Sequence, residues 1–353
     1  MPRCTRNRTV NPLSSHLPPS LGAISIASEE IEVVVLTCKG SDVHSLTDRR
    51  TGIDVLFKTP WGTRRPSLWP TTSNSLERWI DSYAGGWQLI LPNGGDECIE
   101  QGVTWGFHGE AAMVPWSVLE QTSDRLLLEV DLITSPLHIR REMTVAGPVF
   151  EVREVVTNNS SLDVDLMWSH HPAFGAPFVD GSCILSVGCE TVWADDVAPG
   201  NLMAPGSQHK WPLVTTIDGD IADLRKIPDP NEPRAILAYL KDFSSGYFAI
   251  TNPTLGLGVG LRWPLEIFDQ AWLWQEVHFG TGFPWFKRAY VIAVEPCTTA
   301  LGQGICVARS KGLPLRRLAG GQSLEVTVQA VLFEGSKAVQ GISAEGVVSF
   351  AAS

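Results

Sequence analysis

The chain has few basic residues, and this shortage limits the partners that it can bind. Its 353 residues include 27 lysines and arginines against 38 aspartates and glutamates, which gives a formal net charge of −11. Nucleic acids and anionic membrane surfaces are bound through a basic face that neutralises phosphate groups. We therefore expect neither nucleic acid nor membrane as a partner.

Long apolar runs and paired cysteines are also missing. No stretch approaches the ~20 apolar residues of a membrane-spanning helix. The seven cysteines include no Cys-x-x-Cys pair, which argues against a disulfide framework and favours a reducing compartment, the cytoplasm. The first 20 residues carry arginines without an apolar segment, unlike a secretory signal. We expect residues 1–21 to be a disordered tail, with a transit-like targeting segment as the alternative.

Common catalytic motifs are absent as well. The chain has no Gly-x-x-x-x-Gly-Lys-[Ser/Thr], no Gly-x-Ser-x-Gly and no His-Glu-x-x-His. Two pairs, His108 with Glu110 and Glu276 with His278, would each place two metal-binding side chains on one face of an extended strand. The further histidine spacing of a cupin is missing, so we expect no metal.

Glycine and proline, 32 and 24 residues, divide the chain into short segments rich in Val, Ile, Leu and Thr. In residues 149–155 the odd and even positions form separate faces, which is typical of a strand. Helical signal is limited to a short turn at 75–80. The sequence predicts an all-β, mostly antiparallel sandwich or barrel, with one domain at 22–335 and a C-terminal tail at 336–353. The predicted strands include 31–38, 125–133, 137–145, 149–158, 235–240, 247–251, 288–295 and 324–333.

Histidines and carboxylates gather in three segments rich in glycine and tryptophan. His108 lies between two glycines, which permit close approach of backbone or ligand. His171 precedes a proline that should end a strand, leaving the imidazole at a sheet margin. Glu295 closes an apolar strand, where burial would raise its pKa and suit it to be a general base. A structural hydrogen bond would explain Glu295 equally well, and it is the more common role of a histidine placed like His108 or His171.

Thirteen tryptophans stand beside only four tyrosines. A flat aromatic ring with a polar edge suits the apolar face of a pyranose, although core packing must account for most of the thirteen. The residues predicted to contact a sugar, beside His108, are Trp87, Gln88, Asp96, Glu97, Trp116, Trp274 and Glu276.

These segments, in this order, resemble motifs of the aldose 1-epimerase (galactose mutarotase) family. His108-Gly-Glu-Ala-Ala-Met-Val-Pro-Trp116 is similar to the family's His-Gly-Phe-Ala-Arg-x-x-Pro-Trp, and His171-Pro-Ala-Phe174 to its His-Pro-Tyr-Phe. Val294-Glu295-Pro296 is similar to its Leu-Glu-Pro, and Asp48-Arg-Arg-Thr-Gly to an early Asp-x-x-Thr-Gly. The resemblance spans roughly residues 22–333.

The resemblance implies a large antiparallel β-supersandwich of the galactose mutarotase type that needs no cofactor. It implies interconversion of the α and β anomers of a free monosaccharide, by a monomer or homodimer. Glu295 would be the general base on the anomeric hydroxyl and His171 the acid that protonates the ring oxygen. His108 would help to hold the ring oxygen or O1.

Departures from the family pattern leave the sugar open. Gly94-Gly-Asp-Glu97 stands where the family has Asn-Arg, and Ala112 replaces an arginine, which argues against a phosphosugar. Cys297 replaces a glutamine that would contact a hydroxyl. Two alternatives stay open: a non-catalytic sugar-binding or sensing protein, and a hydrolase or lyase in which Glu276 and Glu295 flank a glycosidic bond.

Overall fold

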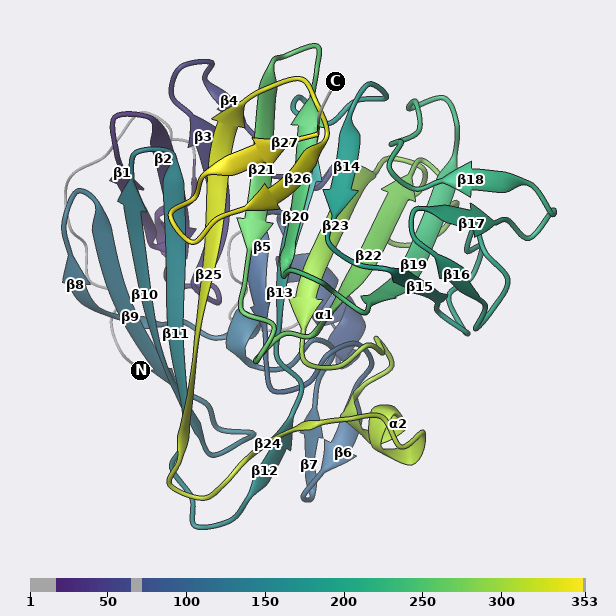
Figure 1. Ribbon diagram of the computed structural model, residues 1–353. Coiled ribbons are helices and arrows are strands. Elements are labelled where there is room, and N and C mark those ends of the chain that lie inside the picture. Colours follow the sequence, from purple (N-terminus) through teal and green to yellow (C-terminus); the bar gives the residue numbers. More distant parts are fainter. Residues whose placement is uncertain (1–16, 65–71, 352–353) are drawn as a thin grey trace.

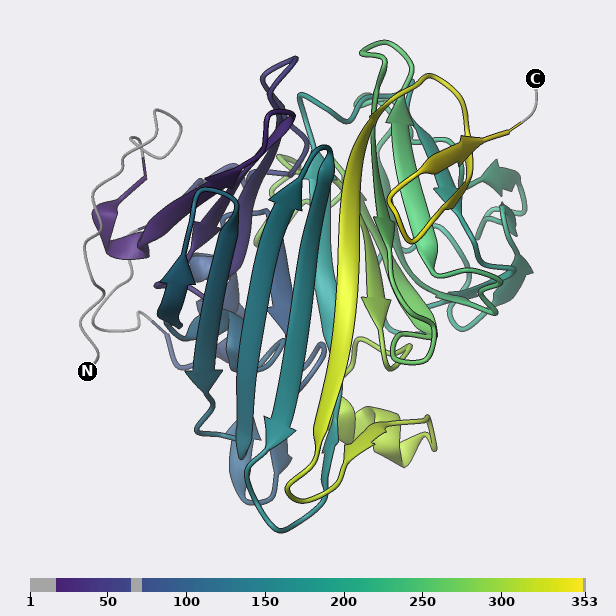
Figure 2. The same ribbon diagram turned by 60° about the vertical axis from the view of Figure 1, so that its left-hand side comes forward.

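The computed structural model describes residues 17–64 and 72–351, so most of the expected N-terminal tail lies outside the described residues. Two large antiparallel sheets face each other across an apolar core (Figures 1 and 2). The all-β prediction is confirmed: the fold is a large antiparallel β-sandwich.

The first sheet has eleven strands, of which the central ones carry the candidate site. Its spatial order is β1 (Ala23–Ala27), β2 (Ile31–Leu36), β3 (Asp42–Asp48), β5 (Trp87–Ile90), β13 (Ser169–Gly175), β23 (Tyr290–Cys297), β22 (Gln270–Val277), β19 (Arg234–Lys241), β15 (Thr191–Ala194) and β16 (Gln208–Lys210), with β4 (Ile53–Asp54) beside β3.

The second sheet has eight strands and one solvent-facing side. Its order is β14 (Ile184–Val187), β20 (Tyr247–Asn252), β21 (Leu257–Arg262), β25 (Ser323–Glu334), β11 (Val149–Asn158), β10 (Leu137–Ala146), β9 (Arg125–Asp131) and β8 (Ser117–Gln121). In β11 the even positions Phe150, Val152 and Glu154 are buried and Arg153 is exposed, so the predicted alternation is present.

Smaller elements complete the described chain. The two-stranded pairs are β6 (Cys98–Glu100) with β7 (Val103–Trp105), β12 (Val164–Leu166) with β24 (Arg316–Leu318), β17 (Leu213–Thr215) with β18 (Ile221–Asp223), and β26 (Val339–Ile342) with β27 (Val348–Phe350). The helices are α1 (Ser75–Ser82) and α2 (Ile305–Ser310), with 3-10 turns at Pro19–Leu21 and Ala111–Met113. The helix α1 extends the turn that the sequence predicted at 75–80.

The C-terminal segment is structured, in contrast to the tail expected at 336–353. The hairpin β26–β27 packs on the second sheet, where Val339 and Ile342 are buried against Tyr247 and Val331 (Figure 1). The two apolar side chains supply the burial that orders the segment, because a hairpin alone is marginally stable in water.

The strands β13 and β23 are buried on both faces, unlike β10 and β11. Their inner face belongs to the core between the sheets, and their outer face is covered by α1 and by aromatic side chains from loops. A polar side chain on the outer face of these strands is therefore held in a dry, aromatic environment.

Candidate active site

The central strands of the first sheet bring His171 and Glu295 together. In the antiparallel pairing of β13 with β23, Ser169 is opposite Cys297, and His171 and Glu295 each lie two residues further along. The resulting distance from His171 Nε2 to Glu295 Oε1 is 3.8 Å. An imidazole and a carboxyl group therefore face each other across two neighbouring strands.

Both side chains of the pair are almost completely buried: that of His171 is 7% exposed and that of Glu295 is 2% exposed. Burial raises the pKa of Glu295 well above its ordinary value. Burial also lowers the pKa of His171 to about 4, and the Lys39 charge adds to this effect. Both shifts favour the uncharged forms, so burial favours a pair in which a carboxylic acid, which carries the transferable proton, faces a neutral imidazole.

Helix α1 places two aromatic rings against the pair. Asn74 caps the helix, its Oδ1 accepting a hydrogen bond from the Glu77 amide at 3.0 Å. Trp79 of α1 and Tyr83, the residue directly after the helix, stack with ring centroids 4.6 Å apart. Their rings lie 5.8 Å and 5.7 Å from the ring of His171. The residues of α1 were not predicted to belong to the site.

His108 joins the pair from a loop and is held in one tautomer. Its ring lies 5.8 Å from that of His171. The Gly95 amide donates a hydrogen bond to His108 Nδ1 at 3.0 Å, so in the neutral ring the hydrogen is on Nε2. Burial lowers the pKa of His108 well below its usual range, and His171 adds to this. His108 is thus a neutral hydrogen-bond donor beside the pair.

The segment of His108 is not extended, which corrects the expectation that His108 and Glu110 share a strand face. His108 has a φ of 57°, and Glu110 instead accepts hydrogen bonds from the Ile133 and Thr134 amides. Glu110 therefore fastens a neighbouring loop. The positive φ turns the chain, so the alternation of side chains along an extended strand does not apply here.

A polar side chain also adjoins His171 from the neighbouring strand β5. Gln88 is the strand partner of His171 and donates through Nε2 to Asp42 Oδ2 at 3.0 Å. The Lys39 ammonium donates to the same oxygen at 2.6 Å and lies 5.9 Å from the centre of the Trp79 ring. The predicted Gln88 is thus next to the pair, together with an ion pair that the sequence did not reveal.

Unpartnered polar atoms are concentrated around this point. Within the described residues, six buried atoms near the pair have no hydrogen-bond partner: Asp42 Oδ1, Trp79 Nε1, the Tyr83 hydroxyl, Gln88 Oε1, His171 Nδ1 and Glu295 Oε2. Buried polar groups in folded proteins are nearly always paired, and an unpaired one costs free energy. A cluster of both donors and acceptors therefore indicates a site for a polar ligand.

Of the three predicted tryptophans, the structure brings only Trp274 to the pair. The Trp274 ring is half-buried and lies 5.7 Å from the His171 ring. Trp87 and Trp116 lie in the core between the sheets, so their placement corrects the prediction of sugar contact. Trp87 precedes Gln88 in β5 and points to the opposite face, because side chains alternate along a strand.

The remaining predicted contacts lie apart from the pair. Asp96 and Glu97 are exposed, and Glu97 accepts a hydrogen bond from Ser75 at the start of α1. Glu276 Oε1 accepts from the amides of residues 279 and 280, each at 2.8 Å, and so fixes the turn after β22. The strand partner of Glu276 is Val291, four residues before Glu295 and therefore about 13 Å from it along the strand.

Within the described chain, no group of three or more His, Cys, Asp or Glu side chains is arranged to hold a metal ion. Nor does that part of the chain contain a helix with the length and apolar character needed to cross a membrane.

Solved structures of galactose mutarotase-like proteins share the fold of this chain. A putative aldose 1-epimerase from Escherichia coli K12 is 12% identical, with a TM-score of 0.63 over 88% of this chain and 99% of that one. A galactose mutarotase related enzyme from Lactobacillus acidophilus is 12% identical, with a TM-score of 0.64 over 90% and 100%. A GalM/aldose epimerase homologue from C. elegans is 13% identical, with a TM-score of 0.61 over 89% and 99%.

The chain belongs to the family described as a domain of unknown function (DUF4432), whose model matches residues 20–330. No curated protein sequence matches the chain. The likeness to the solved structures establishes the fold, and the chemistry rests on the residues of this chain.

Proposed function

We propose that the protein is a mutarotase-like isomerase that interconverts the α and β anomers of a free monosaccharide. The observation that carries the proposal is the pair of His171 and Glu295, 3.8 Å apart in a dry site lined by unpartnered polar atoms. A sugar ring has an apolar face for Trp274 and hydroxyl groups for the donors and acceptors around it.

The proposed reaction moves one proton between two oxygens of the sugar. Glu295 removes the proton of the anomeric hydroxyl O1, and His171 gives a proton to the ring oxygen O5, so the C1–O5 bond breaks. Rotation about C1–C2 presents the other face of the carbonyl, and ring closure reverses both transfers. Each positioned proton transfer accelerates such a reaction by roughly 10²–10⁴-fold.

The resting pair already carries the proton that this reaction needs. The neutral pair and the ion pair of carboxylate and imidazolium contain the same number of protons, so only the position of one proton differs. A dry site favours the neutral pair, and the hydroxyls of a bound sugar stabilise the ion pair by hydrogen bonding. Sugar binding therefore prepares Glu295 as the base and His171 as the acid.

Entry of a sugar requires a movement of α1 in this proposal. The Trp79 ring contacts both His171 and His108, with centroids 5.8 Å and 4.8 Å away. A pyranose that reaches the pair must displace this ring. The unpartnered Trp79 Nε1 then becomes available as a donor to a sugar hydroxyl.

The alternative readings fit the site less well. A hydrolase would need two carboxyl groups about 5–9.5 Å apart, whereas Glu276 is bound to its own turn and about 13 Å along the sheet from Glu295. A sugar sensor on the same fold would not require the acid–base pair. Cytoplasmic location remains part of the proposal. Five cysteines among the described residues are free, Cys98, Cys183, Cys189, Cys297 and Cys306, whereas Cys38 is disulfide-bonded.

The test is saturation-exchange NMR between anomeric protons on a panel of free aldoses. We expect the wild type to accelerate exchange of at least one sugar, and Glu295→Gln and His171→Asn each to reduce the acceleration about 10²–10⁴-fold. Glu325→Gln and His138→Asn, on the second sheet, are the matched controls and should retain activity. Absence of acceleration on every aldose, with sugar binding still visible by tryptophan fluorescence, would contradict the isomerase and support the sensor.

A further inference from the structure

Two half-buried thiols meet where β6 contacts α2. Cys98 is the first residue of β6 and Cys306 the second residue of α2, and the two elements lie side by side (Figure 1). The two thiols are hydrogen-bonded to each other, and the Cys306 amide also donates to the Cys98 sulfur. Both cysteines are free in the structure.

Further hydrogen bonds hold the two thiols in this arrangement. Cys306 Sγ donates to the carbonyl oxygen of Ile99, the residue after Cys98, at 3.4 Å. Further along α2, the Arg309 guanidinium donates to both carboxylate oxygens of Glu100 in β6, at 2.8 Å and 3.1 Å. Because these bonds already fasten α2 to β6, a covalent bond between the two sulfurs needs little movement of the backbone.

The other cysteines of the described chain lack this combination of contact and access. Cys183, Cys189 and Cys297 are buried, and Cys38 is already disulfide-bonded. A thiol that contacts a second thiol and is reached by solvent is open to reversible oxidation. The contact between β6 and α2 is therefore the place where this chain can form a further disulfide.

We propose that Cys98 and Cys306 form a reversible disulfide by exchange with a small-molecule disulfide. One protein thiolate attacks the small disulfide, whose S–S bond breaks and releases one small thiolate. The second protein thiolate attacks the mixed disulfide and releases the other small thiolate. Two protein thiols are thus oxidised, one small disulfide is reduced to two thiols, and the two protein protons pass to them through water.

Cys306 is the thiol that reacts first. Burial and the hydrogen bond to Cys306 raise the pKa of Cys98 to about 12, so at neutral pH Cys98 is a protonated thiol and a poor nucleophile. Cys98 then acts in the second step, which is intramolecular. Its position beside the mixed disulfide offsets its low thiolate fraction.

The disulfide fixes the segment that orients His108. The Gly95 amide donates to His108 Nδ1, and the Gly95 carbonyl oxygen accepts from the His108 amide, each at 3.0 Å. The neighbouring Gly94 carbonyl oxygen accepts from the Gly304 amide, just before α2, at 2.9 Å. The proposed bond therefore closes a unit formed by residues 94–98 and 304–306, on which His108 rests.

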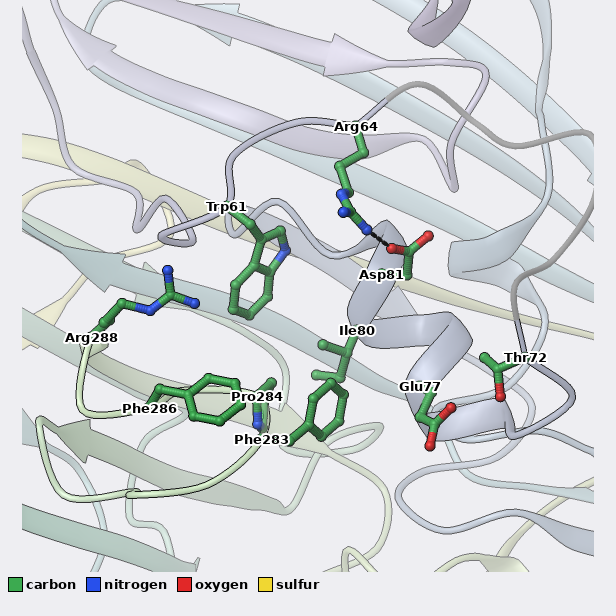
Figure 3. Close-up of a pocket in the computed structure, with 10 residues that line it drawn as sticks. All are labelled: Trp61, Arg64, Thr72, Glu77, Ile80, Asp81, Phe283, Pro284, Phe286 and Arg288. Carbon is green, nitrogen blue, oxygen red and sulfur yellow. Dashed lines mark hydrogen bonds and ion pairs between the residues drawn. The ribbon is translucent and has the colours of Figure 1, made fainter.

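The same segment is attached to α1. Ser75, the first residue of the helix, donates to Glu97 and accepts from the Phe107 amide at 3.1 Å. On its outer side α1 borders a pocket of about 490 Å³, with the rings of Phe283 and Phe286 across from it, so the helix has space to move outward (Figure 3). Since sugar entry requires α1 to move, the disulfide slows entry. This control rests on the proposed function, whereas formation of the disulfide does not.

Peptide mapping by mass spectrometry tests the disulfide. The folded protein is treated with oxidised glutathione at mildly alkaline pH, its remaining thiols are alkylated, and it is digested without reduction. We expect a cross-linked peptide pair that contains Cys98 and Cys306 and that dithiothreitol separates. Cys98→Ser should retain a glutathione on Cys306, and Cys306→Ser should acquire at least about tenfold less glutathione on Cys98. Cys189→Ala, which changes a buried cysteine, should still form the cross-link.

Glutathione that stays on Cys306 of the wild type would overturn the proposal. A disulfide that joins two molecules in non-reducing electrophoresis, in place of the internal cross-link, would overturn it as well.

Hydrogen exchange tests the effect on the site without any turnover. The reference is the double variant Cys98→Ser/Cys306→Ser, treated identically. We expect amides of residues 75–82 and 93–98 to exchange at least about threefold more slowly in the cross-linked wild type. Its kcat/KM for an aldose should fall at least about threefold, whereas the treatment should leave the double variant unchanged.

Two outcomes separate this control from the proposed function. Equal exchange and equal kcat/KM in the cross-linked protein and the double variant would overturn the control of the site. Slower exchange in a protein that turns over no aldose would leave the disulfide standing and contradict the mutarotase.

Discussion

His170 and His171 are adjacent in the sequence and lie on opposite faces of the same strand. His171 faces outward to Glu295, whereas His170 is fully buried between the sheets with its Nε2 3.4 Å from Glu154 Oε2. Glu154 also lies 2.8 Å from the guanidinium of Arg141, and all three inner side chains are inaccessible to solvent. One dipeptide thus links the proposed catalytic pair to a charged network in the core.

Breaking this network should be costly. Glu154→Gln removes the ion-pair partner of the buried Arg141 guanidinium, and we expect it to lower the free energy of unfolding by about 3–5 kcal/mol in urea denaturation. The matched control is Glu325→Gln, which breaks the exposed pair with Arg153 and should cost at most about 1 kcal/mol. Similar losses for both variants would show that the buried network contributes little.

The pH dependence of kcat/KM should be bell-shaped, because the pair works with one proton. Below pH about 4 the neutral pair takes up a second proton on His171, and activity falls. Towards high pH the proton of Glu295 is lost at its raised pKa, and activity falls again. A pH profile of kcat/KM with a single titration near pH 6.5, the ordinary pKa of histidine, would contradict a buried pair with shifted pKa values.

Glu295→Gln should stabilise the protein while it lowers activity. The pKa of Glu295 is raised in the folded state above its unfolded value. Between these two pKa values the folded state binds more protons than the unfolded state, so stability falls as the pH rises. Glutamine does not titrate, so the variant does not lose stability in this way as the pH rises. We expect little difference near pH 4 and a gain of about 1–3 kcal/mol at pH 8, from chemical denaturation at several pH values. A difference that does not vary with pH would refute the explanation.

Tyr83→Phe should separate function from stability. The Tyr83 hydroxyl is buried without a partner among the described residues, so its removal should leave stability unchanged or raise it by up to about 1 kcal/mol. Loss of this donor to the sugar should lower kcat/KM about tenfold. Tyr239→Phe is the control, since that hydroxyl bonds to Asp195 and to the Gly302 amide, and its removal should destabilise the fold. Equal thermal shifts for the two variants would contradict the assignment.

The strands with one solvent-exposed face could be predicted well from the sequence. In β11 the alternation of apolar and polar residues located the inner face, including the position of Glu154. The strands β5, β13 and β23 are buried on both faces and show no such alternation. This is why Trp87 was assigned to the site although its side chain lies in the core, on the face opposite that of Gln88.

By itself, the sequence determined the all-β architecture and the candidate pair, because alternation and short motifs depend on neighbouring residues. Only the tertiary structure decided which face of each central strand carries the site. It also brought Trp79 of α1 and the adjoining Tyr83 over His171, because their contact depends on how a helix docks on a sheet. The same docking excludes water, and that exclusion shifts the pKa values of His171 and Glu295 away from those of the free side chains.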